Sequence, residues 1–298
     1  LMHEFRIPTH NRRYNRGAVG RLAFMVTVLV AVIAAVMYML DALKDEATSA
    51  SVKSEVYIPQ PHKGEVYTKP GFALSYVEQY EIPEWVSYTL TRAMLNKPKF
   101  ERNQDFNPDP SIRSGSAHYK DYKSSGYRRG HLVPAADMAW DKKAMDATFL
   151  LSNVAPMLQN FNDGIWLELE QNVRDWARRY GRIYVVTGPV FESEMPVIGA
   201  NEIAVPRYYF KTIFTQKDQQ PHVISFLLDQ TLETYGPLYD YIVPVDSIEK
   251  LTGIDLFENL YGSWDQEIAL EKQADVSSDQ WPFNATWYQQ RMDLKPSR

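Results

Sequence analysis

The chain has 298 residues, of which 45% are hydrophobic and 23% are charged, so its length and composition are those of a globular protein with a buried core. Its formal net charge of -5 excludes a protein coated in positive charge that binds polyanions by neutralising them non-specifically, and any anion site must be a local patch. The absence of cysteine excludes disulfides, thiolate metal sites and cysteine nucleophiles. A metal ion in this protein would meet oxygen and nitrogen ligands.

An uncharged apolar segment, residues 22–40, lies close to the N-terminus. Its 19 residues, at about 1.5 Å each, would reach roughly 28 Å as a helix, which approaches the hydrocarbon thickness of a bilayer. Bulky residues from Met37 to Leu40 close the segment in place of the small-residue cleavage site of a secretory signal, so we expect an uncleaved transmembrane anchor. The alternative is a buried helix of a globular core, which a helix apolar on all sides rarely fits.

The charges on either side of this segment predict its orientation. Five arginines precede it, whereas Asp41, Asp45 and Glu46 follow it. Because cytosolic flanks carry the excess of Lys and Arg, residues 1–21 are predicted to be a cytosolic basic tail, with the rest of the chain in a periplasmic or external space. The alternative is the mitochondrial inner membrane, with the folded part facing the intermembrane space, because arginine-rich segments also precede apolar spans in imported proteins.

The remaining chain is divided by composition. Residues 41–70 are polar, contain several prolines and lack a sustained period, so they are predicted to be a linker. Residues 71–260 are predicted to form one folded domain, and residues 261–298 an aromatic but aperiodic C-terminal extension.

Strands and helices alternate within the predicted domain. Segments rich in β-branched and aromatic residues predict strands at 72–77, 86–91, 182–188, 204–215 and 222–228, of which the second is also compatible with a helix. Helical spacing of Ile165, Leu169 and Val173 predicts a helix over 162–180 that begins at an Asn-Asp cap, and Gly253 is expected to end a second helix at 246–252. The fold class is therefore α+β.

The densest cluster of chemically useful residues is DYKSSGYRRGHLVPAADM, residues 121–138. His131 titrates near neutrality and suits a general base. Gly130 allows a backbone to approach a phosphate closely, and Arg129 offers a planar fork of donors to phosphate oxygens. Hydrolysis of a phosphodiester requires such a base, a nearby cation and donors for the developing charge. A histidine with a purely structural role is the alternative for an isolated Arg-Gly-His.

A second block of such residues follows at 149–176, and the two blocks together match the motifs of a known protein family. The Gly-Tyr-X-Arg-Gly-His-Leu block, followed by Leu-Ser-Asn, Phe-Asn-X-Gly-X-Trp and Leu-Glu, resembles the DNA/RNA non-specific endonucleases of the ββα-metal (His-Me finger) type, which are endonuclease G-like. The resemblance covers about residues 71–257. It implies a central antiparallel sheet with flanking helices, in which a strand or hairpin with Arg129 and His131 crosses the helix with Asn162 and Glu170.

The resemblance also implies roles for individual residues. Asn162 would be the direct protein ligand of one Mg²⁺ or Mn²⁺ ion, and Glu170 would act through a water on that ion. Arg174 would face the phosphate, and Asn153 would support the site. The spacing of Asn162, Glu170 and Arg174 by multiples of four places them on one helix face. An exposed ion pair with Glu170 is the alternative for Arg174, and a turn-capping amide is the alternative for Asn153.

Two positions depart from the family pattern. Arg128 stands where many members have Asp, and it could contact phosphate or lower the pKa of His131. Met157 stands where many members have Gln. The methionine lacks the amide of that glutamine, so we expect turnover rate and substrate range to differ from those members.

The predicted partners are DNA and RNA, a membrane through residues 22–40 and a second copy of the chain in a homodimer, whereas the sequence does not indicate whether a protein inhibitor exists. Residues 113–182 carry eleven Lys or Arg against eight Asp or Glu, a local excess of three positive charges that fits a confined phosphate groove. Two other functions stay open at this point: a membrane-anchored nucleic-acid receptor that does not cut, and a phosphodiesterase acting on small nucleotides.

Overall fold

The computed structural model describes residues 24–37, 39, 57–60, 63–102, 105–218, 220–257, 264–272 and 279–294. The chain divides into two compact units, residues 1–50 and 51–298, which are described separately. In the first unit, residues 24–37 form a helix whose apolar side chains are exposed. Within the described ranges, no helix combines the length and apolarity needed to cross a membrane. The anchor predicted for residues 22–40 lies partly outside those ranges and is not confirmed.

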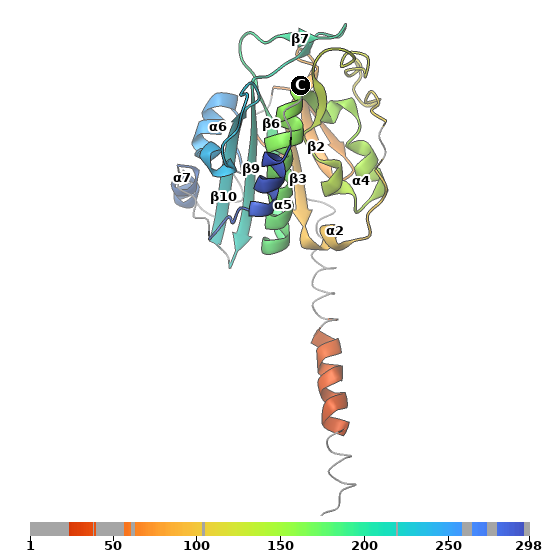
Figure 1. Cartoon of the computed structure of the whole chain (residues 1–298), viewed down its shortest axis with the longest axis vertical. Helices are drawn as coiled ribbons and strands as arrows, with labels where there is room; N and C mark the ends of the chain where they lie inside the picture. Colours follow the sequence, from red (N-terminus) through yellow and green to blue (C-terminus); the bar gives the residue numbers. More distant parts are fainter. Residues whose placement is uncertain are drawn as a thin grey trace, which may run out of the picture. The chain divides into compact units, whose positions relative to one another are not determined.

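A six-stranded antiparallel sheet in the order β1-β2-β3-β6-β9-β10 forms the centre of the second unit (Figure 1). Its strands are β1 (Glu65–Lys69), β2 (Phe72–Val77), β3 (Ile82–Thr91), β6 (Arg182–Val190), β9 (Tyr208–Lys217) and β10 (Gln220–Asp229). The central antiparallel sheet implied by the family resemblance is therefore confirmed.

The predicted strands agree with the structure except at one proline. The segment 72–77 is β2, and 86–91 is the end of β3, after which α2 (Arg92–Asn96) begins. The segments 182–188 and 222–228 lie within β6 and β10. The predicted strand 204–215 is divided into β8 (Ile203–Ala204) and β9, with Pro206 between them, because proline has no N–H to donate to a strand ladder.

The predicted linker extends too far toward the C-terminus. Residues 65–69, assigned to it from their position after a proline-rich stretch, are the edge strand β1 and pair with β2 across a tight turn at Gly71, where φ is +86°. Gln60 also bridges to Asp255 near the other end of the domain. The folded domain therefore begins before residue 71.

Two hydrophobic clusters cover the two faces of the sheet, because successive strand residues point to opposite faces. On β9, Tyr209 and Ile213 belong to one cluster, whereas Phe210 and Phe214 belong to the other. The first cluster includes the apolar side of α5 (Leu167–Tyr180). The second includes α6 (Val245–Thr252), which ends at Gly253 as predicted. The sheet is thus enclosed between α5 and α6.

The site-bearing segment is an excursion between the neighbouring strands β3 and β6. It contains α2, β4 (Arg128–His131), α3 (Ala135–Met138), α4 (Lys142–Ala147), η1 (Leu151–Asn153), β5 (Val154–Met157), η2 (Phe161–Trp166) and α5. Later in the chain come the small hairpin of β7 (Val197–Ile198) with β8, and η3 (Leu238–Tyr241).

The long predicted helix starts differently from the expectation. Asn160, not Asn162, is the N-cap, and its side-chain oxygen accepts from the N–H of Phe161 at 3.0 Å. The first turn, η2, is wider than an α-helix and is kinked at Gly164, where φ is -104° and ψ is -108°. Asn162 therefore lies inside a π-type turn, a feature frequent at functional sites.

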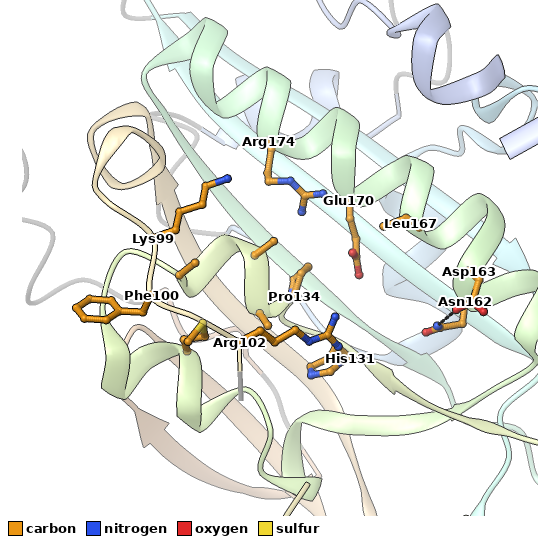
Figure 2. Close-up of a pocket in the computed structure, with 14 residues that line it drawn as sticks. Lys99, Phe100, Arg102, His131, Pro134, Asn162, Asp163, Leu167, Glu170 and Arg174 are labelled. Carbon is orange, nitrogen blue, oxygen red and sulfur yellow. Dashed lines mark hydrogen bonds between the residues drawn. The ribbon is translucent and has the colours of Figure 1, made fainter. Parts of the chain in front are cut away.

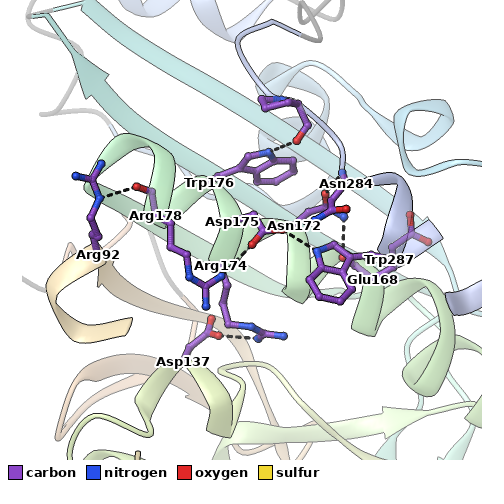
Figure 3. Close-up of polar contacts among 11 residues, drawn as sticks. Arg92, Asp137, Glu168, Asn172, Arg174, Asp175, Trp176, Arg178, Asn284 and Trp287 are labelled. Atoms are coloured by element: carbon purple, nitrogen blue, oxygen red, sulfur yellow. Dashed lines mark hydrogen bonds and ion pairs between the residues drawn. The ribbon is translucent and has the colours of Figure 1, made fainter. Parts of the chain in front are cut away.

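The C-terminal extension contains two helices that its aperiodic sequence did not predict, α7 (Trp264–Glu271) and α8 (Ala285–Met292). Trp281 is buried against the ring of Trp176, with 5.2 Å between ring centroids. Trp176 donates its indole N–H to the carbonyl of Pro282 at 2.9 Å (Figure 3). The side chain of Asp175 accepts from Asn284 and Trp287.

A buried ion pair ties α8 to α5 more firmly. The side chains of Arg291 and Glu168 are 8% and 3% exposed, and they pair directly. The same guanidinium donates to the carbonyls of Tyr235 and Gly236 at 2.9 and 2.8 Å. The described end of the chain is thus part of the domain core, which corrects the predicted boundary at residue 261.

Candidate active site

A cavity of about 380 Å³ lies between α5 and the segment that follows β4. Figure 2 shows the side chains around it, which come from three separate stretches of the chain. The polar part of the lining consists of Lys99, Arg102, His131, Asn162, Asp163, Glu170 and Arg174. The structure therefore brings together four of the residues singled out from sequence, and adds Lys99, Arg102 and Asp163.

The strand β4 presents His131 to this cavity as one arm of a two-stranded hairpin. It pairs antiparallel with β5, with Arg129 opposite Pro156 and His131 opposite Val154. The backbone carbonyl of His131 accepts from the indole N–H of Trp166 at 3.1 Å, which joins β4 to η2. The hairpin followed by the helix that carries Asn162 and Glu170 is the arrangement that the family resemblance implied.

The imidazole of His131 is held by aromatic packing. Its ring packs against those of Phe106 and Phe149, with centroid distances of 5.1 and 5.0 Å, and these two rings also contact each other at 5.2 Å. Its Nε2 atom is buried and has no hydrogen-bond partner among the described residues. Burial, followed by the charges of Arg102 and Arg129, lowers the pKa of His131 to about 3. The ring is therefore neutral at physiological pH and able to accept a proton.

Asn162 and Glu170 offer oxygen ligands to a hard cation. The side-chain nitrogen of Asn162 donates to Asp163 at 2.7 Å, so its amide oxygen is the atom left to act as ligand. Glu170 lines the same cavity, and burial raises the pKa of its carboxyl, while the charges of Arg174 and Lys211 oppose that effect. An amide oxygen and a carboxylate beside a space large enough for several waters fit the coordination that Mg²⁺ prefers.

Arg174 is fixed at the rim of the cavity by a buried partner. Its guanidinium donates to Asp137 at 2.8 Å, and Asp137 is completely buried. The second oxygen of Asp137 accepts from the hydroxyl of Tyr88 at 2.9 Å. The alternative of an exposed pair between Arg174 and Glu170 is therefore wrong, because the hydrogen-bonded partner is Asp137. The Nη1 atom of the guanidinium is held by Asp137, while the side chain still lines the cavity.

Sequence reasoning missed Arg102 and Lys99, two exposed cations that line the cavity opposite α5. They lie in an irregular stretch after α2 and share no spacing with the two motif blocks. Only the fold brings them to the site. Together with Arg174 they place three cationic side chains on the cavity lining, which also holds the carboxylates of Asp163 and Glu170.

Asn153 lies outside the cavity lining, so the structure places it as a supporting residue that does not contact what the cavity holds. It is completely buried, and its side-chain oxygen accepts from the N–H of Val133 at 3.0 Å. Its nitrogen donates to the carbonyls of Val133 and Thr148 at 3.0 and 2.9 Å. These bonds hold the chain that leaves His131 against η1, so Asn153 positions the loop that follows His131.

The two arginines of β4 lie outside the cavity lining. Arg129 is exposed and its guanidinium lies 4.5 Å from the ring centroid of Phe106, beside His131. Arg128 is exposed opposite Met157. Met157 is buried, and a Cβ at Gly130 would overlap its sulfur. The glycine is therefore required by this packing, and Met157 acts as core support of β4 away from the reacting groups.

Residues 51–263 match the family model described as DNA/RNA non-specific endonuclease. This chain belongs to that family. It is accordingly an endonuclease, a hydrolase that acts on nucleic acids. Activity in the endonuclease G group of this family depends on a divalent metal.

Individual relatives agree with the family match. The chain is 32% identical over 213 residues to human mitochondrial endonuclease G, which covers 67% of this chain and 72% of the relative. It is 35% identical over 214 residues to a nuclease of Syncephalastrum racemosum, covering 64% and 67%. Among solved structures, a complex of EndoG with EndoGI superposes with a TM-score of 0.63 at 33% identity, covering 67% of this chain and 88% of that one.

Proposed function

We propose that the protein is a divalent-metal-dependent endonuclease that cuts both DNA and RNA with little sequence preference and leaves 5′-phosphate ends. The observation that carries this proposal is the convergence of His131, Asn162 and Glu170 with two arginines on one cavity. No base-reading module is visible in the sequence, so recognition would rest on the phosphate backbone.

His131 acts as the general base in this proposal. Its neutral imidazole accepts a proton from the water that attacks phosphorus, through the Nε2 atom that has no partner among the described residues. The rings of Phe106 and Phe149 pack against the imidazole and keep it in place without using that nitrogen. The hydrogen bond from the indole N–H of Trp166 to the His131 carbonyl fixes the position of β4 relative to η2.

The arginines stabilise charge on the phosphate. Arg174, anchored by Asp137, and Arg102, on the opposite wall, offer donors to non-bridging oxygens. Arg129 and Arg128 extend the positive surface outward along β4 and bind neighbouring phosphates of the strand. A cation held directly by Asn162, and through water by Glu170, would supply Lewis-acid stabilisation of the phosphate and the leaving 3′ oxygen.

The pH dependence of turnover follows from the surroundings of His131. Arg102 and Arg129 help lower the pKa of His131 in the free protein. Bound phosphates offset those charges, so the pKa of His131 is higher in the complex than in the free enzyme. The acid limb of kcat reports the enzyme–substrate complex, and the acid limb of kcat/KM reports the free enzyme. The limb of kcat should therefore lie at the higher pH. Because the pKa of His131 in the free protein is about 3, the rate profiles must extend from about pH 2 to pH 9 to measure both limbs, and coincident limbs would contradict this assignment.

Replacing Asn162 by Ala should weaken metal binding along with catalysis. We expect a higher metal concentration for half-maximal rate, and a kcat lower by about 10²-fold or more at saturating Mg²⁺ because the ion is misplaced. Asn96→Ala is the matched control, since Asn96 is exposed and lies outside the cavity lining. An unchanged metal titration in Asn162→Ala would exclude the amide as a ligand.

Digestion of plasmid, RNA and a dinucleotide by the full chain, with Mg²⁺, Mn²⁺ or a chelator, separates the three candidate functions. Metal-dependent cleavage of both polymers, with labelled 5′-phosphate ends, is expected. Tight binding of polymer without cleavage under any metal would identify a receptor. Preferential hydrolysis of the dinucleotide would identify a small-substrate phosphodiesterase.

The predicted membrane anchor forms a separate part of the proposal. The described helix at residues 24–37 exposes Phe24, Met25 and Met37 to 71%, 67% and 67%, an unusual surface for a helix in water. We propose that residues 22–40 insert in a membrane, with the nuclease domain on the side opposite residues 1–21. Several relatives are mitochondrial nucleases, so the intermembrane space is the alternative to a periplasmic or external site. Release of the protein by alkaline carbonate would refute membrane insertion, and protease protection reports the orientation.

Two protein partners complete the proposal. A homodimer is expected, and a light-scattering mass in detergent measures it. An inhibitor that fills the basic cavity is the second partner, because the neighbouring solved structure is a complex between EndoG and its inhibitor EndoGI.

A further inference from the structure

Five carboxylates gather on the face of the sheet opposite α5, where α6 lies. Oxygen atoms of Asp246, Glu249 and Glu271 all lie within 4.8 Å of one another. Those of Asp255, Glu267 and Glu271 satisfy the same limit. We call these five residues the α6–α7 carboxylate cluster. Its two triads share Glu271, the last residue of α7, so α7 is held against α6 and Asp255 despite the repulsion between their carboxylates.

Glu271 is the residue that points to a ligand. It is only 8% exposed, and its Oε1 atom is buried without a hydrogen-bond partner among the described residues. The carboxylate is directed into the cluster, because its oxygen belongs to both triads. A buried anionic oxygen that is neither solvated nor hydrogen-bonded is unfavourable unless a cation or proton compensates it.

The pKa values of the cluster also indicate that its carboxylates need a compensating positive charge. Burial and then the charge of Glu249 raise the pKa of Glu271 to about 8. Burial also raises the pKa of Glu249 to about 7, with Asp255 and Asp246 adding to the shift, although Glu249 accepts a hydrogen bond from the N–H of Leu256. These carboxylates repel one another and lie away from solvent, so the anionic cluster has a high affinity for a positive charge.

We propose that the α6–α7 carboxylate cluster is a calcium site, separate from the catalytic metal and located on the other face of the sheet. All its ligands are carboxylate oxygens, and two oxygens that each lie about 2.4 Å from one ion are at most about 4.8 Å apart. Ca²⁺ accepts six to eight such ligands in flexible geometry, whereas Mg²⁺ usually retains several waters and binds one or two carboxylates. Calcium would fasten α7 to α6.

Calcium binding to the full-length Asn162→Ala protein tests this proposal, because that change removes the proposed ligand of the catalytic metal. By calorimetry we expect one Ca²⁺ per chain, and by thermal denaturation a rise in Tm with added Ca²⁺. Adding Glu271→Gln should weaken binding at least tenfold and abolish the rise in Tm. Glu194→Gln, at an exposed carboxylate outside the cluster, is the matched control and should change neither.

Further outcomes keep the test decisive. Asp246→Asn, at the less buried end of the cluster, serves as a second variant if Glu271→Gln fails to fold. Equal Ca²⁺ affinity in the cluster variants and in the control would overturn the proposal. So would a Glu271→Gln protein that is more stable than its parent while neither binds Ca²⁺, because protons would then be sufficient to neutralise the cluster. Mg²⁺-dependent nuclease activity in Glu271→Gln alone should equal that of the wild type.

Discussion

Replacing His131 by alanine is expected to lower kcat by about 10²- to 10⁴-fold, the contribution typical of a positioned general base. Binding of DNA should change little, because the arginines that contact phosphate are retained and the histidine ring makes no polar contact through Nε2 with the described residues. Single-turnover cleavage and DNA binding in the presence of Ca²⁺ measure the two quantities separately.

Chemical rescue distinguishes a base from a merely structural residue. The alanine variant leaves an empty space beside the contacting rings of Phe106 and Phe149, so added imidazole can enter it and restore part of the rate. His118→Ala is the control, since His118 lies in a loop outside the cavity lining. A His131→Ala protein with full activity would remove the proposed mechanism.

The second large effect is expected on stability. Arg291→Ala should lower the free energy of unfolding by about 3–5 kcal/mol at pH 7, because Glu168 is left buried without its counter-charge. Burial already raises the pKa of Glu168, and Arg291 opposes that rise. Without the arginine, the folded pKa increases further above the unfolded value, so the variant loses stability as pH rises from about 4.5. Its deficit should therefore be larger at pH 7 than at pH 5, which urea denaturation at both values measures.

Arg178→Ala provides the matched control on the same helix. Arg178 pairs with Asp175 at 2.9 Å, but their side chains are 44% and 29% exposed. Solvent screens this pair, so its loss should change stability by less than about 1 kcal/mol and show little dependence on pH. Equal deficits for the two arginine variants would mean that the end of the chain is not part of the cooperative core.

The parts of the site that the sequence predicted are those set by local geometry. His131 and its flanking glycine occur in one short strand, and Glu170 and Arg174 recur at helical spacing within α5, so their shared direction follows from the period. Asn162 was found from its place in the motif, and the kinked turn η2 brings it to the same cavity. Arg102 could not be found in this way, because it follows no period and approaches the cavity only through the path of the chain after α2. The partner of Arg174 was likewise missed, since Asp137 comes from α3.

The fold prediction likewise succeeded where the local sequence determines an element and failed where contacts with distant segments do. Buried strands such as β2 and β6 were recognised because they are rich in β-branched and aromatic residues. Most side chains of the edge strand β1 are exposed or only partly buried, and the strand follows a proline-rich stretch, so its sequence lacks a strand pattern. Its conformation is determined by pairing with β2. The helix α8 has no buried residues of the kind that create an apolar period, and the hydrogen bonds of Asn284, Trp287 and Arg291 fix it in place.

The pairing of β3 with β6 has a consequence for how the enzyme forms. Val86 pairs with Thr187 and Thr91 with Arg182, so the central ladder joins residues separated by the whole site-bearing excursion. Closing so long a loop carries an entropic penalty before any ladder contact compensates it, which slows the folding of proteins rich in distant contacts. The hairpin of β9 and β10 can form early, since its strands adjoin in sequence. The catalytic cavity, whose walls lie within the excursion, therefore assembles late in folding, and a nascent or partly folded chain has no competent nuclease site.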